Sequence, residues 1–327
     1  MDSIAAVARV EPEMSFADTH RPQSVSPVAG GEGLAPSLEA RYAEVCDRVA
    51  AAAKKAARRP QDVILVAVTK NAEPEHIREL IAMGHRDFGE NRVQQLVQRA
   101  SMIAEWLGRQ RRFPTSRQVQ GDDAGSLLFV PGSESDLGAK SAQPGGKDGV
   151  RWHMIGHLQR NKAKKVLEFT RLVHSVDSLR LAEELQAAAM RRDQMVEVLL
   201  QINCSGEASK FGCAVPAAGP LAEQIETMVN VRLRGVMTMA APNASEDETR
   251  RCFARCRDLF DEIRGQVSDP RRFNILSMGM SGDYEIAISE GANIVRVGSA
   301  IFGNNPVAES PEEPEEKEEP EDSEPLP

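Results

Sequence analysis

Lys70 is the residue of this sequence whose type and position first point to chemistry. It follows the hydrophobic run VILVAV at 63–68, with only Thr69 between them. A lysine at the end of such a strand is expected to point into a partly desolvated mouth, where burial lowers the pKa of its amine and frees it to attack a carbonyl. The alternative is a lysine that reaches solvent at a strand end, and position alone favours that alternative.

Two segments rich in glycine and serine near the C-terminus give a second signal. Ser277 opens the segment SMGMSG, which also contains Ser281, and a later strand runs through Arg296 into Gly298 and Ser299. Small residues let backbone N–H groups approach an anion, and serine hydroxyls add hydrogen-bond donors. Each loop taken alone is equally consistent with a glycine turn, in which Ser281 caps the next helix.

Lys70 and the two glycine- and serine-rich segments lie at opposite ends of the ordered sequence, and a closed barrel would bring them together. Helical periodicity separates most of the candidate strands, and one more amphipathic helix, from Leu38 to Val49, precedes the first strand. Eight alternations in about 225 residues favour an α/β fold, a single (β/α)8 barrel of the TIM type with an extra N-terminal helix. An open doubly wound sheet remains the alternative. The eight candidate strands are Val63–Val68, Arg86–Phe88, Arg151–Ile155, Leu172–Val176, Val196–Ile202, Arg232–Met237, Phe273–Leu276 and Asn293–Val297.

In a closed barrel the first strand neighbours the eighth, so Lys70 and the two loops converge. Barrel enzymes carry their chemistry at the carboxyl ends of the strands, and phosphates frequently bind in the loops after strands seven and eight. A reactive lysine beside a phosphate cradle predicts a phosphorylated aldehyde that is held as a Schiff base.

Three segments lack the periodicity of a packed domain. Residues 1–36 collect prolines and glycines and are predicted to be a disordered leader, and residues 305–327 a disordered acidic Glu/Pro tail. Residues 108–149 hold eight glycines, three prolines and five serines, which predicts a surface insertion. The barrel is therefore expected over residues 37–304.

The net charge of −9 comes from the tail, because residues 309–327 hold ten acids and one lysine while the other 308 residues have 39 acids and 39 bases. Broad attraction to nucleic acid is therefore not supported. No run of about 20 apolar residues predicts a membrane span, and the N-terminus resembles neither a signal nor a transit peptide. Five cysteines without a CxxC pair predict reduced thiols in the cytoplasm.

Two other features have plain interpretations. His153 and His157 are four residues apart, but they lie at a strand end and its loop and lack an HExxH arrangement, so a metal site is not expected. The basic stretch Arg160–Lys165 either contacts an anion or a partner at the rim or forms a solvated charged face, and the second is favoured.

Six segments together resemble the pyridoxal phosphate homeostasis protein family, also called proline synthase co-transcribed homologues. They occur in the family's order and cover about residues 37–304, apart from the insertion. The matching segments are VAVTK at 66–70, FGENRVQQL at 88–96, WHMIGHLQRNKAKK at 152–165, HSVDS at 174–178, LSMGMSGD at 276–283 and VRVGSAIFG at 295–303.

The resemblance implies a barrel similar to the N-terminal domain of alanine racemase that binds pyridoxal 5′-phosphate (PLP). Lys70 matches the lysine that forms the internal aldimine, and Arg296 matches the arginine that faces the pyridine nitrogen. Asn91 matches an asparagine near the cofactor. Gly298 and Ser299 match the phosphate-binding pair, which Ser281 and Ser277 accompany; Ser299 stands where a threonine is common.

The resemblance further implies a PLP carrier that is not an enzyme, is a monomer and delivers PLP to apo-PLP enzymes. A guanidinium beside the pyridine nitrogen opposes its protonation and weakens the electron sink. A racemase also needs a second acid/base, which in alanine racemase is a tyrosine from another domain. Tyr42 and Tyr284 are the only tyrosines here, and both are expected to pack. The alternatives are a racemase-like enzyme and an interaction scaffold formed by the leader, insertion and tail.

Overall fold

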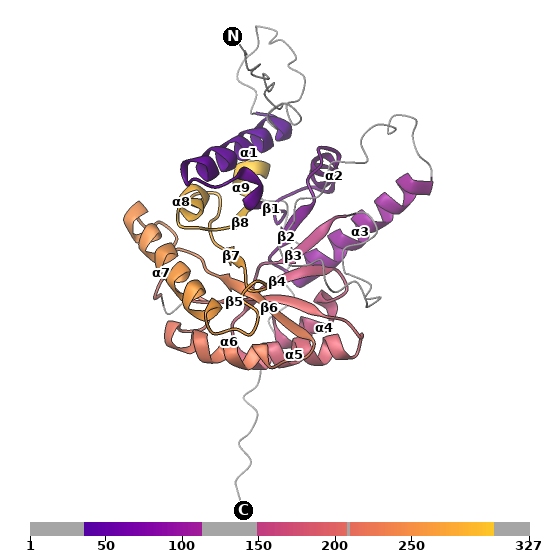
Figure 1. Ribbon diagram of the computed structural model, residues 1–327. Coiled ribbons are helices and arrows are strands. Elements are labelled where there is room, and N and C mark those ends of the chain that lie inside the picture. The colour runs from indigo at the N-terminus through magenta and orange to yellow at the C-terminus, as the bar shows by residue number, and fades with distance from the viewer. Residues whose placement is uncertain (1–35, 113–148, 208–209, 304–327) are drawn as a thin grey trace, which may run out of the picture. The chain divides into compact units, whose positions relative to one another are not determined.

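Eight parallel strands close into a barrel in the computed structural model, which describes residues 36–112, 149–207 and 210–303 (Figure 1). Each strand pairs with the next, and β1 pairs with β8. The predicted (β/α)8 barrel is confirmed, and the open doubly wound sheet is wrong because β1 and β8 are not edge strands. The strands are β1 (Ile64–Val68), β2 (Asp87–Glu90), β3 (Arg151–Met154), β4 (Thr170–Val176), β5 (Val196–Gln201), β6 (Val231–Met237), β7 (Ile275–Ser277) and β8 (Ile294–Val297).

A helix follows every strand, and α1 (Leu38–Lys55) is the extra helix that the sequence predicts before β1. Figure 1 shows α1 beside α8 and α9, and residues of α1 contact both. The other helices are α2 (Pro74–Ala82), α3 (Val93–Arg112), α4 (Ala163–Val166), α5 (Leu179–Met190), α6 (Ala218–Glu226), α7 (Glu246–Arg264), α8 (Tyr284–Ser289) and α9 (Ser299–Phe302), with 3₁₀ helices η2 (Pro60–Asp62), η3 (Arg160–Lys162) and η4 (Val215–Ala217).

The first helix shows how local sequence fixes an element. Ser37 is its N-cap, and the Ser37 hydroxyl accepts a hydrogen bond from the backbone N–H of Ala40 at 3.2 Å. Val45, Val49 and Ala53 recur every four residues and are buried on one face. That apolar stripe packs α1 onto the barrel, which explains why this helix is stable outside the eight repeats.

The core has two layers, as the alternation of side chains along each strand requires. Most buried apolar side chains fill the space between strands and helices. A smaller cluster fills the inside of the barrel and comprises Val66, Leu172, Leu199, Met237, Ile275 and Ile294. The inside of the barrel is therefore filled by side chains, and ligand sites of such barrels lie at the end where the strands stop.

Several predicted boundaries shift. The insertion does not begin at residue 108, because α3 continues through residues 108–112, where the helical pattern outlasts the last strongly apolar residues. β2 runs on to Glu90 instead of ending at Phe88, because a buried polar partner stabilises the acidic residue at its end. β7 begins at Ile275 and not at Phe273, although Phe273 is buried. The leader, the tail and residues 113–148 lie outside the described residues.

All five cysteines are free thiols, as predicted, and Cys46 is the one that is only half-buried. No described helix has both the length and the apolar character that crossing a membrane requires.

Asp87 makes the barrel less stable at acid pH. Burial by itself raises the pKa of this carboxyl, but hydrogen bonds from His153 and Arg151 overcome that effect and lower the pKa well below its ordinary value. Well above pH about 4, the ordinary pKa of an aspartate, the stabilisation is complete. As the pH falls through this value the unfolded chain takes up the proton first, and stability falls by up to about 1.4 kcal/mol per pH unit.

Urea unfolding between pH 3 and pH 6 measures this contribution. The difference in free energy of unfolding between the wild type and Asp87→Asn is expected to be constant above pH about 4.5 and to shrink below pH about 4. Two curves that stay parallel down to pH 3 would show that Asp87 is not the acid-sensitive group.

Candidate functional site

Lys70 lies at the carboxyl end of β1, in a tight turn from Thr69 to Ala72. The turn is closed by a hydrogen bond from the N–H of Ala72 to the carbonyl of Thr69 at 2.8 Å. The side chain of Lys70 is exposed, so the predicted burial is wrong and the alternative of a lysine that reaches solvent is correct. The reason is its position two residues beyond Val68, the last residue of the strand, where barrel walls no longer enclose it.

Arg99 on α3 holds this turn from behind. Its guanidinium donates to the carbonyl of Thr69, to the carboxylate of Glu90 and, at 2.9 Å, to the carbonyl of Ala72. Glu90 is fully buried, and burial raises the pKa of its carboxyl while Arg99 opposes the rise. One guanidinium thus binds the carbonyls of Thr69 and Ala72, which lie on either side of Lys70 and Asn71. This fixes the backbone from which the lysine projects.

The loops after β7 and β8 are joined by the hydroxyl of Ser281. This oxygen accepts hydrogen bonds from the N–H groups of Gly298 at 3.2 Å and Ala300 at 3.5 Å. Gly279 turns the first loop with a φ of +88°, and a Cβ there would lie 2.6 Å from the Cβ of Ala287. The two loops therefore form one cradle of backbone and hydroxyl groups, and Ser299 is exposed in it.

This cradle lies directly against β1. A Cβ on Gly298 would be only 3.1 Å from the carbonyl oxygen of Val68, two residues before Lys70. Pairing of β1 with β8 places Val66 opposite Arg296 and Ala67 opposite Val297. The predicted convergence of Lys70 with the loop that follows the last strand is thus a consequence of barrel closure.

Arg296 is buried below the cradle with its guanidinium held from two sides. It donates to the hydroxyl of Ser277 at 2.6 Å and to the carbonyl of Thr238 at 3.0 Å. Burial lowers its pKa to about 10, which still leaves it charged at neutral pH. Ser277 therefore binds Arg296 inside the barrel and does not share the loop hydrogen bonds of Ser281.

Asn91 is exposed just after β2, on the other side of β1. Gly156, after β3, packs against its backbone: a Cβ at Gly156 would overlap the carbonyl oxygen of Asn91. Asn91, Lys70, Arg296 and the loops with Ser277 and Ser281 thus belong to the adjoining strands β7, β8, β1 and β2, and they occupy one continuous arc of the mouth.

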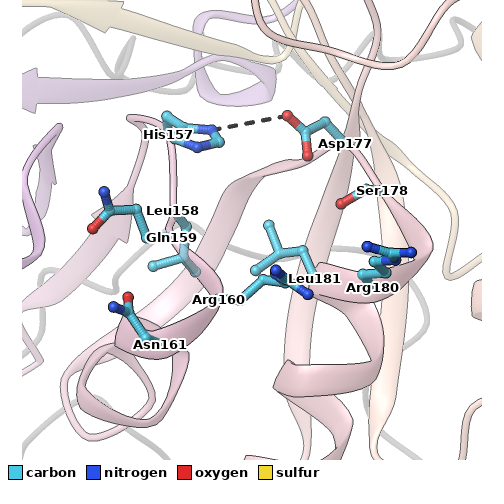
Figure 2. A pocket seen from close by; sticks show the side chains of 9 residues that line it. All are labelled: His157, Leu158, Gln159, Arg160, Asn161, Asp177, Ser178, Arg180 and Leu181. Carbon is cyan, nitrogen blue, oxygen red and sulfur yellow. Dashed lines mark ion pairs between the residues drawn. The ribbon is translucent and has the colours of Figure 1, made fainter. Parts of the chain in front are cut away.

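A pocket of about 320 Å³ lies at the rim between the loops after β3 and β4 (Figure 2). Figure 2 shows His157 and Asp177 facing each other, with Nδ1 of His157 3.9 Å from a carboxylate oxygen of Asp177. Arg160 lines this pocket, whereas Lys164 and Lys165 are exposed. The basic stretch is thus divided between a pocket wall and a solvated face.

The two histidines considered for a metal site, His153 and His157, lie in different surroundings. His153 is buried inside the barrel, whereas His157 is partly exposed at the rim and stacks on Phe211 with 4.1 Å between ring centroids. Within residues 36–112, 149–207 and 210–303, no group of three or more histidine, cysteine or acidic side chains is arranged to hold a metal ion.

Sequence reasoning missed three residues that support the site: Thr238, Glu90 and Arg99. Thr238 contributes its carbonyl, which no side-chain pattern reveals. Glu90 stands in the segment FGEN, where an acidic residue between a buried strand and Asn91 was the available signal. Arg99 falls on a helix whose charged residues resemble an ordinary solvated face.

The fold is that of the barrels related to the N-terminal domain of alanine racemase. A family model described as "Alanine racemase, N-terminal domain" matches residues 45–306. An alanine racemase of Clostridium difficile 630, solved in complex with cycloserine, superposes with a TM-score of 0.53 over 81% of this chain and 61% of that chain. The two are 12% identical, so this likeness establishes the barrel alone.

Closer relatives identify the family. The chain is 36% identical over 267 residues to the pyridoxal phosphate homeostasis protein of Pseudomonas aeruginosa, across 82% of this chain and 95% of the relative. The structure of PipY from Synechococcus elongatus PCC7942 with PLP bound is 30% identical, with a TM-score of 0.58 over 79% of this chain and all of that chain. The chain belongs to the pyridoxal phosphate homeostasis protein family, as its motifs predict.

Proposed function

We propose that this protein binds PLP at the C-terminal mouth of the barrel and takes part in PLP homeostasis, as a carrier that is not an enzyme. The observation that carries the proposal is the convergence of Lys70, the Ser281–Gly298 cradle and Arg296 on the adjoining strands β7, β8 and β1. The relatives' names and the PLP-bound structure of PipY support it.

The residues of the arc fit the three polar parts of PLP. When bound, PLP supplies an aldehyde that condenses reversibly with amines, and Lys70 presents an exposed amine at the strand end. The hydroxyls of Ser281 and Ser299 are available as donors for the phosphate, and the oxygen of Ser281 holds the N–H groups of Gly298 and Ala300 in the cradle. Asn91, on the next strand, lines the opposite side of the lysine.

Arg296 gives the site the character of a holder. If the pyridine nitrogen of PLP faced Arg296, the guanidinium would donate a hydrogen bond to it and, being positively charged, would oppose its protonation. An unprotonated ring stabilises a carbanion poorly, which disfavours amino-acid chemistry. Ser277 and the carbonyl of Thr238 keep the guanidinium in place.

Neither tyrosine is placed to act as a second acid/base. The hydroxyl of Tyr42 lies 3.1 Å from Nδ1 of His85 on the outer side of the strands, and Tyr284 is buried in the layer between strands and helices, as predicted. We therefore propose reversible attachment of PLP to Lys70, release to apo-PLP enzymes, and action as a cytoplasmic monomer.

Exchange at the Cα of an amino acid distinguishes the carrier from a racemase-like enzyme. The PLP-loaded protein is incubated with L-alanine in deuterium oxide, and NMR follows loss of the Cα proton. A carrier is expected to give no exchange beyond that of free PLP at the same concentration. Catalytic exchange that depends on the protein would replace the carrier by the racemase-like alternative.

Ser281→Ala is expected to weaken PLP binding by about tenfold while leaving the fold intact. The substitution removes a hydroxyl whose oxygen accepts from the N–H groups of Gly298 and Ala300, so that its proton is left to donate to the phosphate. One hydrogen bond to a charged group, worth about 1.5 kcal/mol, accounts for this factor. Fluorescence titration with PLP measures it, and Ser289→Ala, an exposed serine on α8, is the matched control. Equal PLP affinities of the wild type, Ser281→Ala and Ser289→Ala would show that Ser281 does not contribute to PLP binding.

A further inference from the structure

A continuous chain of buried side chains crosses the inside of the barrel and ends at Arg296. Nε2 of His153 lies 3.1 Å from Oδ1 of Asp87, and Nδ1 of His153 lies 2.9 Å from Nε2 of His174. Nδ1 of His174 lies 3.0 Å from the Ser277 hydroxyl, which Arg296 contacts at 2.6 Å. No member of this chain is more than 7% exposed.

The donors and acceptors of this chain fit together in one direction when both rings are neutral. The Asp87 carboxylate only accepts, so Nε2 of His153 carries a proton and its Nδ1 accepts. Nε2 of His174 must then donate to that nitrogen, which leaves Nδ1 of His174 as an acceptor. The Ser277 hydroxyl donates its proton to Nδ1 of His174, and the oxygen of Ser277 accepts a hydrogen bond from the Arg296 guanidinium.

The surroundings of His174 favour a neutral ring. Arg151 already pairs with Asp87, because its Nε and Nη2 groups each donate to one of the two carboxylate oxygens. A proton added to His174 would place a third positive charge, with Arg151 and Arg296, against the carboxylate of Asp87 in the buried interior of the barrel. Burial, and after it His153 and Arg296, lower the pKa of His174 well below the ordinary value.

We propose that Asp87, His153 and His174 are positioning residues that act on the PLP site through Ser277. They commit the one proton of the Ser277 hydroxyl to His174, so that only its lone pairs face Arg296. The guanidinium is thereby held by Ser277 and by the carbonyl of Thr238, and its remaining N–H groups are available to the ligand. This inference rests on the proposed function, but its core concerns tautomers that exist without PLP.

The first test uses the wild-type protein without PLP. Ring ¹⁵N labelling and NMR at pH 7 report the protonation of each imidazole nitrogen, and His153→Gln assigns the signals. We expect both rings to be neutral, with the proton on Nε2. A doubly protonated His153, or a proton on Nδ1 of His174, would overturn the inference whether or not the protein binds PLP.

The second test breaks the chain at the end that is remote from the mouth. In Asp87→Asn the side-chain amide can donate as well as accept, so the direction is no longer fixed. We expect a population with Nδ1–H to appear on His174 and PLP binding to weaken about fivefold, the loss of about one neutral hydrogen bond.

Glu197→Gln is the matched control, because Glu197 is an equally buried carboxylate that pairs with Arg171 and Arg234 instead. It is expected to leave the His174 tautomer and the PLP affinity unchanged. Equal effects of the two substitutions would show that Asp87 acts only on stability and would overturn the positioning role. Wild-type protein that binds no PLP but has the expected tautomers would refute the proposed function and leave the chain's direction standing.

Discussion

Lys70→Ala is expected to abolish the covalent attachment of PLP and, with it, the aldimine absorption band of the loaded protein. Lys70 is exposed at the end of β1, next to the cradle through the contact between Gly298 and Val68. Removal of its amine leaves the phosphate and ring contacts but no nucleophile at that end of the ligand. The variant should still bind PLP, with the spectrum of the free aldehyde and lower affinity.

Absorption spectra after addition of PLP and removal of the unbound excess measure this effect. Because the side chain of Lys70 is exposed, its loss is expected to leave the free energy of unfolding close to that of the wild type. Lys164→Ala, an exposed lysine on α4, is the matched control and should keep the full band. A Lys70→Ala protein that still shows the aldimine band, and that borohydride reduction still labels covalently with PLP, would show that PLP is attached to another amine.

Arg99→Ala is expected to produce the largest loss of stability among the substitutions near the site, about 3–5 kcal/mol. The substitution leaves the carboxylate of Glu90 fully buried without its guanidinium partner. It also frees the carbonyls of Thr69 and Ala72, so the turn that carries Lys70 loosens and PLP attachment weakens. Urea unfolding of the protein without PLP measures the first effect, and PLP titration measures the second.

A double-mutant cycle separates the buried charge from the rest of the interaction. Arg99→Ala combined with Glu90→Gln is expected to recover a large part of the stability, because a neutral amide costs less to bury than an unpaired carboxylate. Recovery of stability without recovery of PLP affinity would confirm that Arg99 also fixes the turn. Arg109→Ala, which removes an exposed pair with Glu105 on the same helix, is the control and should unfold like the wild type. Equal stability of Arg99→Ala and the control would contradict this account of the clamp.

Barrel closure explains how much of the site could be predicted from the sequence. The alternation of strand and helix patterns implies that strand one meets strand eight, and this adjacency alone brings Lys70 beside Gly298 and Ser299. The side chains concerned lie within a few residues of strand ends, where position along the chain determines position in space. The prediction therefore needed only the number and order of the strands.

The remaining features depend on contacts between residues that are distant in sequence. The exposure of Lys70 follows from the turn beyond β1, whose shape is fixed by Arg99 from another helix. The pairing of His153 with His174 requires both strands to direct an imidazole inward, and it depends on a register in which Leu172, two residues before His174, lies opposite His153. Hydrophobic periodicity states which face a residue occupies but not which polar group it meets there.

The place of Ser277 shows the same limit. Its sequence neighbourhood groups it with Ser281, yet the end of β7 turns its hydroxyl inward to Arg296 and His174, while Ser281 lies in the loop. Two serines four positions apart therefore have different partners, because a strand alternates its side chains and a loop does not.

Peptide mapping after borohydride reduction of the PLP-loaded wild-type protein tests the central claim most directly. Reduction fixes PLP to the amine that holds it, and mass spectrometry of the digest identifies the modified lysine. The account predicts one PLP per chain, attached to Lys70. Attachment spread over several exposed lysines, or located on a lysine outside the mouth, would contradict it.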